Sequence, residues 1–412
     1  MLSWDHGSSI ARMQRERAWI EIDLAALAHN VQQVQSLLSP QTELMAVVKA
    51  DAYGHGAVTV AQTALQAGAT WLGVATIPEG IELREAGIEA PILVLGATHT
   101  REQIRAIVHW QLQPTLCTPK QALIYSEAVG HRDSLPVHLK LDTGMTRLGT
   151  PWQQAVEFVQ LVKRLPNLSI ASVYSHLATA DDRDLTTMRQ QQHRYESAIR
   201  ACGYDFSSPH PRFHLANSAA TLVDSTLHYD MVRTGLILYG LYPAEHLQHR
   251  VTLKPVMQVK ARVTQVKTIQ AGTGVSYGHR FVADRETQIA VVGIGYADGV
   301  PRNLSMQLSA LVRGQRVRQV GAITMDQLML DVNAIPDLQE GEVVTLLGQD
   351  GNEQILADDW ASLLGTISWE VLCGFKHRLP RVAVGKSFKA TQSKLPTETH
   401  STLHSLNLLS DA

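Results

Sequence analysis

Between Leu44 and Arg233 the sequence repeats one pattern, in which a short apolar run is followed by a longer amphipathic stretch. Runs of this length and continuity are typical of strands buried on both faces of a parallel sheet. Eight runs are strand candidates: Leu44–Lys49, Trp71–Ala75, Pro91–Leu95, Leu112–Leu116, Val137–Leu141, Ser169–Ser175, Arg212–Leu215 and Asp230–Arg233. Eight β-α units over such a length are typical of a (β/α)8 TIM-like barrel.

The alternative is a doubly wound open sheet, which also alternates strands with helices. The strand count favours the barrel, and so does the lack of a Gly-x-Gly-x-x-Gly turn after the first strand. Helices are expected between most of the strands, at Ala57–Gln66, Arg101–Trp110, Gln153–Arg164 and Leu185–Ala201. Ahead of the repeat, Ala18–Ile22 alternates like a strand, and Asp23 is placed to cap a helix over Leu24–Leu38.

The pattern changes near Lys254, where apolar and polar residues begin to alternate with a period of two. The later apolar runs are joined by Gly, Asp and Asn, with no long helical pattern until about Asp358–Leu364. These runs are Gln288–Ile294, Leu308–Val312, Gln327–Val332 and Glu342–Leu347. We therefore expect a barrel over residues 18–250 and a mostly β domain over 251–385, with loosely ordered ends at 1–17 and 386–412.

Composition bears on partners and location. A net charge of −2 over 412 residues gives no electrostatic footprint for nucleic acid or an anionic membrane. Cys117, Cys202 and Cys373 show neither metal-ligand nor disulfide spacing, so we expect no metal and a reducing compartment. No signal peptide or bilayer-spanning stretch is recognisable in the sequence, which predicts a cytoplasmic protein.

One charged side chain ends the first barrel strand. Lys49 follows a buried apolar run and precedes a loop with two glycines. A lysine at that edge is partly desolvated, which lowers its pKa and makes the amine a better nucleophile and proton carrier. It could form a Schiff base with a carbonyl cofactor or contact a phosphate; alternatively, it merely caps a strand at the surface.

Polar residues follow the later barrel strands as well, where barrel enzymes carry their chemistry. Lys140 and Arg147 follow the fifth strand, His176 the sixth, Ser218 the seventh, and Arg233 lies in the eighth. Charged groups at successive strand ends are hard to explain as core filling, so they predict a polar ring around the barrel mouth. Arg233 alone could instead pair with a nearby carboxylate.

The segment Val48–Gly56, Val-Lys-Ala-Asp-Ala-Tyr-Gly-His-Gly, resembles the pyridoxal-phosphate attachment motif of bacterial alanine racemases. At least five separate segments match this family, over roughly Ala18 to Val384. The resemblance implies a pyridoxal-phosphate-dependent isomerase that interconverts L- and D-alanine and supplies D-alanine for peptidoglycan. It also implies a homodimer.

The resemblance assigns cofactor contacts to eight residues: Lys49, Tyr53, Arg147, His176, Ser218, Arg233, Gly235 and Leu236. In the family, the lysine matching Lys49 carries the cofactor as a Schiff base, and the arginine matching Arg233 contacts the pyridine nitrogen. A guanidinium keeps its own proton, so it disfavours a second positive charge on the ring. The resulting carbanion is expected to be less delocalised and shorter-lived, which limits side reactions.

Inversion of a stereocentre needs one proton carrier on each face of the substrate. By resemblance these are Lys49 and, from the partner subunit, Tyr277, which on its own could be a turn aromatic next to a glycine. Substrate contacts are assigned to Arg147 and to the backbone at Met325, again from the partner. The chain departs from the family at Trp369, where a tyrosine is common.

Lys140 matches a position that is carbamylated in some members of the family. Alternative functions are a racemase of another amino acid such as serine, a basic amino-acid decarboxylase, and a pyridoxal-phosphate carrier without turnover. A decarboxylase would carry an acidic residue beside the pyridine nitrogen, where this sequence has Arg233. It would also carry a cysteine in a loop of the β domain, whereas this sequence has no cysteine between Cys202 and Cys373. A carrier would resemble the barrel alone.

Overall fold

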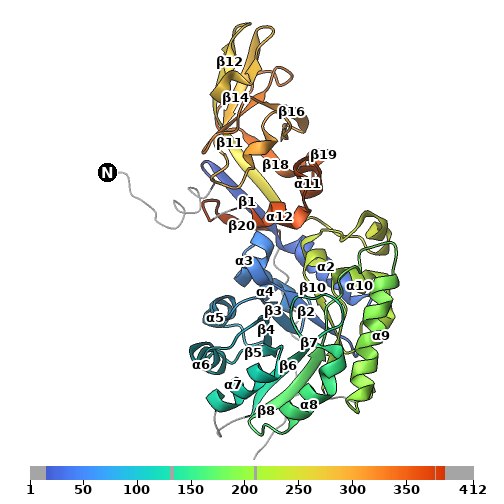
Figure 1. The fold of residues 1–412 in the computed structure, drawn as a ribbon. Helices are drawn as coiled ribbons and strands as arrows, with labels where there is room; N and C mark the ends of the chain where they lie inside the picture. The colour runs from blue at the N-terminus through green and yellow to red at the C-terminus, as the bar shows by residue number, and fades with distance from the viewer. Residues whose placement is uncertain (1–14, 130–133, 208–210, 376, 386–412) are drawn as a thin grey trace, which may run out of the picture.

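The computed structural model describes residues 15–129, 134–207, 211–375 and 377–385. A barrel of parallel strands with surrounding helices adjoins a mostly β domain at one end (Figure 1). The loosely ordered ends expected at 1–17 and 386–412 lie outside the described residues, apart from residues 15–17. Across the described ranges, we find no helix with the length and apolar character needed to span a membrane.

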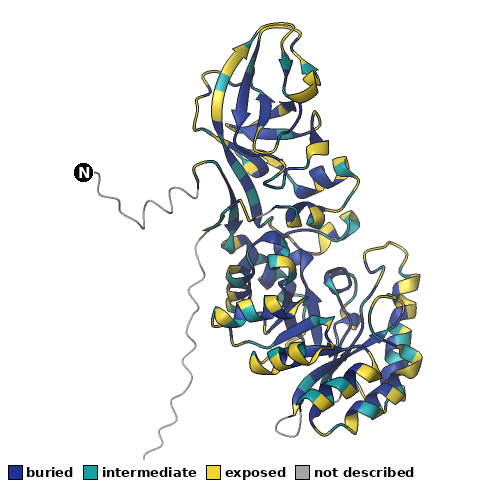
Figure 2. Cartoon of the chain, turned by 60° about the vertical axis from the view of Figure 1, so that its left-hand side comes forward, coloured by how far each residue is buried: buried dark blue, intermediate teal, exposed yellow. Residues whose placement is uncertain are grey.

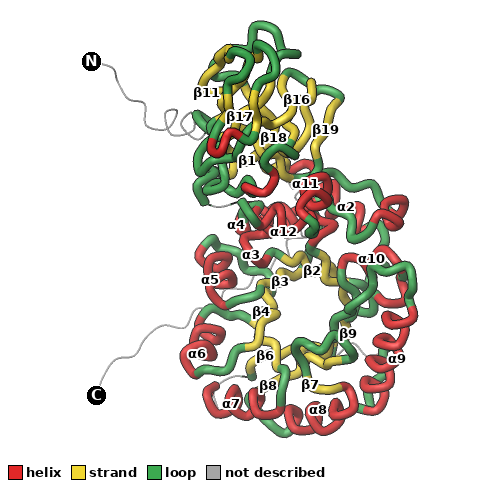
Figure 3. The backbone as a smooth tube through the Cα atoms, turned by 45° about the horizontal axis from the view of Figure 1, so that its top comes forward, coloured by secondary structure: helices red, strands yellow, loops and turns green. Residues whose placement is uncertain are grey.

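Eight parallel strands form the barrel in the order β10-β2-β3-β4-β5-β6-β8-β9, which confirms the predicted (β/α)8 fold and excludes the open sheet. Hydrogen bonds from Asp230 N to Phe213 O and from Arg233 N to Ala216 O, both 3.0 Å, join the last two strands and nearly close the ring (Figure 3). The strands are β2 (Glu43–Val47), β3 (Trp71–Val74), β4 (Ile92–Ala97), β5 (Gln113–Leu116), β6 (Leu135–Asp142), β8 (Leu168–Tyr174), β9 (Arg212–His214) and β10 (Met231–Thr234). Each overlaps one of the eight predicted runs.

Helices surround the ring (Figure 3), and their outward faces are exposed whereas the strands are largely buried (Figure 2). Asp23 caps the first of them as predicted, because its carboxylate accepts hydrogen bonds from the N–H groups of Ala25 and Ala26, both at 2.9 Å. The helices are α2 (Leu24–Gln35), α4 (Ala57–Gln66), α5 (Ile77–Glu85), α6 (Arg101–His109), α7 (Pro119–Val129), α8 (Ala155–Lys163), α9 (Thr186–Ala201) and α10 (Ser218–Val223).

The strand that precedes α2 corrects the predicted start of the barrel. β1 (Ala18–Asp23) pairs antiparallel with β11 (Met257–Ile269) and parallel with β20 (Arg381–Val384), so it belongs to the sheet of the β domain. The range 18–250 expected for the barrel therefore begins with a strand of the other sheet. Alternation predicts a strand with one buried face, but it does not indicate which sheet the strand joins.

The second sheet has the order β19-β18-β15-β16-β17-β14-β11-β1-β20, and β18 also pairs with β11, so the strands from β18 to β11 close into a circuit. The first half of β11 alternates buried and half-buried residues, as the period of two predicted. The other strands and helices of this domain are β12 (Gly274–Val275), β13 (Phe281–Val282), β14 (Thr287–Val292), β15 (Ser309–Val312), β16 (Gln315–Val320), β17 (Leu328–Asp331), β18 (Val343–Asp350), β19 (Glu353–Ile355), α11 (Ala357–Leu364) and α12 (Ser368–Cys373). A mostly β domain is thereby confirmed.

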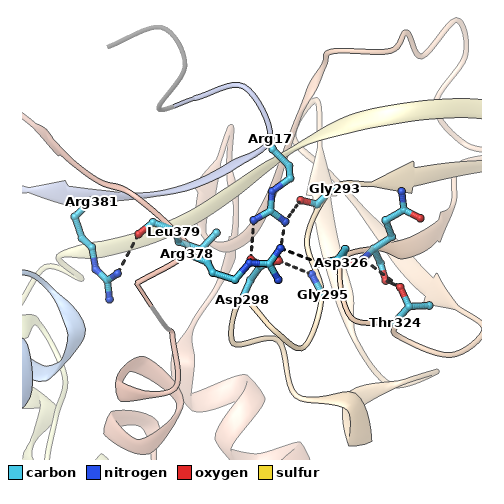
Figure 4. Close-up of polar contacts among 10 residues, drawn as sticks. Arg17, Gly293, Gly295, Asp298, Thr324, Asp326, Arg378, Leu379 and Arg381 are labelled. Carbon is cyan, nitrogen blue, oxygen red and sulfur yellow. Dashed lines mark hydrogen bonds and ion pairs between the residues drawn. The ribbon is translucent and has the colours of Figure 1, made fainter. Parts of the chain in front are cut away.

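A buried carboxylate fastens the N-terminal side of β1 to the β domain (Figure 4). Asp298 is fully buried and accepts hydrogen bonds from both terminal nitrogens of Arg17, at 2.8 and 2.7 Å, and from Gly295 N at 3.0 Å. Arg378 Nε lies 3.6 Å from the same carboxylate, while its terminal nitrogen donates to Asp326 at 2.8 Å. Arg17, expected in the loosely ordered N-terminal extension, is thus held by two charge-assisted bonds.

The two arginines around Asp298 give a matched pair of stability predictions. Arg17→Ala should lower the free energy of unfolding by about 2 kcal/mol, because it leaves a buried carboxylate without its bidentate partner. Arg378→Ala should cost less than about 1 kcal/mol, because its closer partner Asp326 is exposed. Urea unfolding of both variants measures the difference, and equal losses would contradict the assignment.

Candidate active site

A cavity of about 590 Å³ opens at the C-terminal ends of the barrel strands, here called the barrel mouth. Its lining includes the four cations Lys49, Lys140, Arg147 and Arg233, together with one carboxylate, Asp181, among the described residues. The predicted polar ring is therefore present in one place. A cavity with this excess of positive charge suits an anionic ligand.

Lys49 follows β2 and begins α3 (Lys49–Gly54), whose backbone is unusual. The residues from Ala50 to Tyr53 have φ between 52° and 55°, which makes a left-handed turn without glycine. Two carboxylates support the turn: Glu79 accepts from Ala50 N and Asp51 from Ala57 N, both at 2.8 Å. The turn places the lysine at the cavity, where burial and the nearby charge of Arg147 lower the pKa of Lys49 below its usual value.

The left-handed turn predicts that a substitution to glycine stabilises the protein, whereas glycine in a right-handed helix destabilises it. Ala50 is exposed, so Ala50→Gly should act only through the backbone. It should raise the free energy of unfolding by about 1 kcal/mol, because relief of the left-handed strain outweighs the added freedom of the unfolded chain. The control Ala106→Gly, within the right-handed helix α6, should lower it by about 1 kcal/mol. Losses in both variants would show that the turn is unstrained.

Four of the predicted cofactor residues gather beside this turn. Gly235 N donates to Ser218 Oγ at 3.1 Å, and a Cβ placed on Gly235 would lie 2.8 Å from the Tyr53 hydroxyl. Only glycine therefore allows this close approach. Burial raises the pKa of Tyr53 to about 12, so its hydroxyl remains a donor at neutral pH. With Leu236 beginning a 3-10 turn after Gly235, the group suits a phosphate.

Arg233 lies buried at the cavity wall and bonds only to neutral groups. It donates to the carbonyls of Ser175 (2.7 Å) and Leu215 (3.1 Å) and to Nδ1 of His214 (2.9 Å) and of His176 (3.3 Å). No carboxylate of the described chain is among its partners, which removes the alternative of a structural ion pair. Burial lowers the pKa of Arg233 to about 10, so it remains a cation at neutral pH.

The other predicted ring residues lie around the same cavity. Lys140 is buried on β6, and burial together with the charge of Arg233 lowers its pKa to about 8. Burial and the same arginine hold the pKa of His176 well below its usual value, so this imidazole is neutral. Arg147 lines the cavity from the loop after β6.

Tyr277 and Met325 are not brought to this cavity. They belong to the β domain, where their exposed fractions are 73% and 52%. Tyr277 lines a separate hollow of about 820 Å³, and Ser276 Oγ before it donates to Ala322 O at 2.8 Å. Within one chain, therefore, Lys49 and the residue expected to act opposite it line two different cavities.

The β domain does contribute to the barrel mouth through α12, which packs against α3. A Cβ on Gly54 would lie 2.7 Å from Leu372 O, and Arg381 Nε donates to Gly54 O at 3.1 Å. This packing places Trp369 and Cys373 in the cavity lining. Cys373 was not predicted as a site residue, and the available signal was its position one helical turn after Trp369, which puts both on one face of α12.

His214 and Tyr174 are two further residues whose place in the site was not predicted. The two rings stack at 4.7 Å with an interplanar angle of 6°, and Tyr174 lines the cavity. Both lie at the ends of barrel strands beside predicted residues, and that position was the available signal.

Comparison with known proteins agrees with this architecture. A family model described as the alanine racemase N-terminal domain matches residues 22–243, and one described as the C-terminal domain matches residues 256–383. An alanine racemase from Nostoc sp. is 70% identical over 375 residues, which are 90% of this chain and 96% of the relative. One from Synechocystis sp. is 65% identical and covers 90% of this chain and 100% of the relative.

Solved structures agree as well. An alanine racemase from Clostridium difficile 630 has a TM-score of 0.84 at 34% identity, over 89% of this chain and 96% of that one. Another, from Bacillus anthracis with bound L-Ala-P, has the same TM-score and identity over 91% and 96%. Fold, site and comparisons define a barrel-type amino-acid isomerase. Within that class, the chain belongs to the alanine racemase family.

Proposed function

We propose that this protein interconverts L-alanine and D-alanine with pyridoxal phosphate bound at Lys49. The observation that carries the proposal is the position of that lysine, whose pKa is lowered, at a cavity lined by three further cations. Membership of the family supports alanine as the substrate. The supply of D-alanine for peptidoglycan and a cytoplasmic location rest on the sequence expectations and stay predictions.

The residues at the barrel mouth fit pyridoxal phosphate. When bound, the cofactor supplies an electron-accepting ring that makes the proton on Cα of the amino acid acidic. Lys49 would hold its aldehyde carbon, and the cradle around Gly235 offers donors for its phosphate. Arg147 would meet its phenolic oxygen and His176 its ring. Because Arg233 stays charged, it would donate to the pyridine nitrogen and keep that nitrogen from binding a proton.

The proton transfers would need one base on each face of the substrate. The Lys49 amine, with its lowered pKa, would take or give the proton on one face of the substrate. We assign the opposite face to Tyr277 of the partner subunit. Positive charge near its hydroxyl would help it act as a base, and Arg233 would supply that charge, because His176 is neutral.

A homodimer with composite sites follows from the same assignment. Tyr277 and Met325 are exposed on the β domain, where Ala297 N donates to Met325 O at 3.0 Å, and neither residue lines the barrel mouth of its own chain. In a symmetric dimer each copy would present these two residues to the barrel mouth of the other. Met325 of the partner subunit, with Arg147, would then bind the substrate carboxylate.

A racemisation assay across a panel of L-amino acids, run in deuterated water with added pyridoxal phosphate, tests the proposed function. We expect alanine to racemise with uptake of deuterium at Cα, and larger amino acids to react far more slowly. Faster turnover of serine would reassign the substrate, and release of carbon dioxide from a basic amino acid would indicate a decarboxylase. Cofactor binding without turnover of any amino acid would indicate a carrier protein.

A further inference from the structure

A chain of direct hydrogen bonds runs through the barrel interior from Arg233 at the mouth toward the opposite end. Arg233 bonds to His214 (2.9 Å), His214 to Ser172 (2.8 Å), Ser172 to His138 (2.6 Å), and His138 to Gln113 (2.7 Å). Each residue comes from a different strand, and the five strands are neighbours around the ring, from β10 to β5. Ser172, His138 and His214 are fully or almost fully buried.

Arg233 determines which atom donates and which accepts in each of these hydrogen bonds. A guanidinium has donors and no acceptor, so Nδ1 of His214 must accept and the proton of a neutral ring must lie on Nε2. That Nε2–H then donates to Ser172 Oγ, whose own proton goes to Nδ1 of His138. His138 in turn carries its proton on Nε2 and donates to the Gln113 carbonyl oxygen.

Both rings are neutral, as this assignment requires. Burial lowers the pKa of His138 to about 3, and burial with the charge of Arg233 holds the pKa of His214 well below its usual value. A chain that begins at a donor-only group cannot pass a proton toward the cavity. It can only fix orientations, and the stacked ring of Tyr174 limits rotation of His214 further.

We propose that Ser172 and His138 are positioning residues that hold His214 as the Nε2–H tautomer, with Nδ1 turned to Arg233, and thereby aim the guanidinium at the barrel mouth. Without the serine hydroxyl, a buried Nε2–H has no acceptor, and the His214 ring gains by turning away from Arg233. One part of this proposal rests on the proposed function, namely that the guanidinium contacts the pyridine nitrogen of the cofactor.

The test compares Ser172→Val with Ser172→Thr, two side chains of nearly equal shape of which only threonine keeps the hydroxyl. The full-length, cofactor-free chain is labelled with ¹⁵N-histidine, and NMR reports which ring nitrogen of each histidine carries the proton. We expect the Nε2–H pattern for His138 and His214 in the unmodified protein and in Ser172→Thr. In Ser172→Val, the proton of His214 should no longer lie on Nε2 alone. A proton on Nδ1 of His214 in the unmodified protein would overturn the proposal.

The dissociation constant for pyridoxal phosphate gives a second readout in the same variants. Ser172→Val should raise it about tenfold, the factor that corresponds to one hydrogen bond, and Ser172→Thr should restore it. The control Tyr125→Phe removes a buried hydroxyl that bonds to Thr98 and takes no part in the hydrogen bonds from Arg233 to Gln113. It should change neither the tautomer of His214 nor the dissociation constant. Equal effects of the valine and threonine variants, or of the control, would contradict the assignment.

If Ser172→Val does not fold, His138→Phe tests the next bond, because it keeps an aromatic ring but removes the acceptor of the serine proton. We expect His214 to retain its Nε2–H tautomer with a smaller loss of cofactor affinity, since Ser172 remains. If His138→Phe changed the tautomer of His214 as much as Ser172→Val is expected to, the proposal that Ser172 acts directly on His214 would be overturned. The NMR result does not involve turnover, so failure of this proposal and failure of the proposed function are distinguishable.

Discussion

Lys49→Ala is expected to lower racemisation of both alanine enantiomers by about 10⁴-fold or more, because the variant loses both the nucleophile that holds the cofactor and one of the two proton carriers. The loss should be equal in the two directions, since neither direction can proceed without this amine. The measurement is the initial rate from each enantiomer with saturating pyridoxal phosphate.

Two variants serve as controls for Lys49→Ala. Lys49→Arg keeps the positive charge but cannot join an aldehyde as a lysine amine does, so it should be as inactive as the alanine variant. Lys120→Ala removes an exposed lysine from α7 and should leave the rates unchanged. If Lys49→Arg retained substantial activity, Lys49 would contribute only its positive charge and would be neither the nucleophile nor a proton carrier.

Tyr277→Phe is expected to act on one enantiomer far more than on the other. Abstraction of the α-proton from L-alanine should fall by about 10³-fold, the usual contribution of a general base, while exchange at Cα of D-alanine should fall much less. Deuterium uptake at Cα, followed by NMR from each enantiomer separately, measures the two effects. Equal losses would remove the assignment of two bases to two faces.

Mixing the two inactive variants tests whether Tyr277 acts on its own chain or on the other. In a mixed dimer of Lys49→Ala and Tyr277→Phe subunits, composite sites would leave one site with both residues intact and one with neither. A random mixture should then recover about a quarter of the activity of the unmodified protein. No recovery, under conditions where mass spectrometry shows exchanged subunits, would contradict a composite site.

The sequence predicted the barrel well because its signal is local. Each parallel strand is buried on both faces and reads as a short apolar run, so the eight runs could be counted along the chain. The residues at the barrel mouth follow from that count, since strand ends in a barrel converge. Lys49, Lys140, Arg147 and Arg233 thus line one cavity although they are far apart in the sequence.

Other features depend on contacts that a local pattern does not contain. β1 looks like any strand, and its place in the second sheet follows only from pairing with β11 and β20. The left-handed turn after Lys49 contains ordinary residues, and it is supported by Glu79 from the first turn of helix α5. His214 was not predicted as a site residue because its role arises from a bond to Arg233 across two strands. Tyr277 could be assigned from a resemblance alone.

Chemical labelling can identify the residue that carries the cofactor. The protein is incubated with pyridoxal phosphate, reduced with borohydride, digested and analysed by mass spectrometry. We predict that the native protein is yellow and that the pyridoxyl group is recovered on the peptide containing Lys49. A protein that stays colourless, or a label recovered on another lysine such as Lys140, would contradict this prediction.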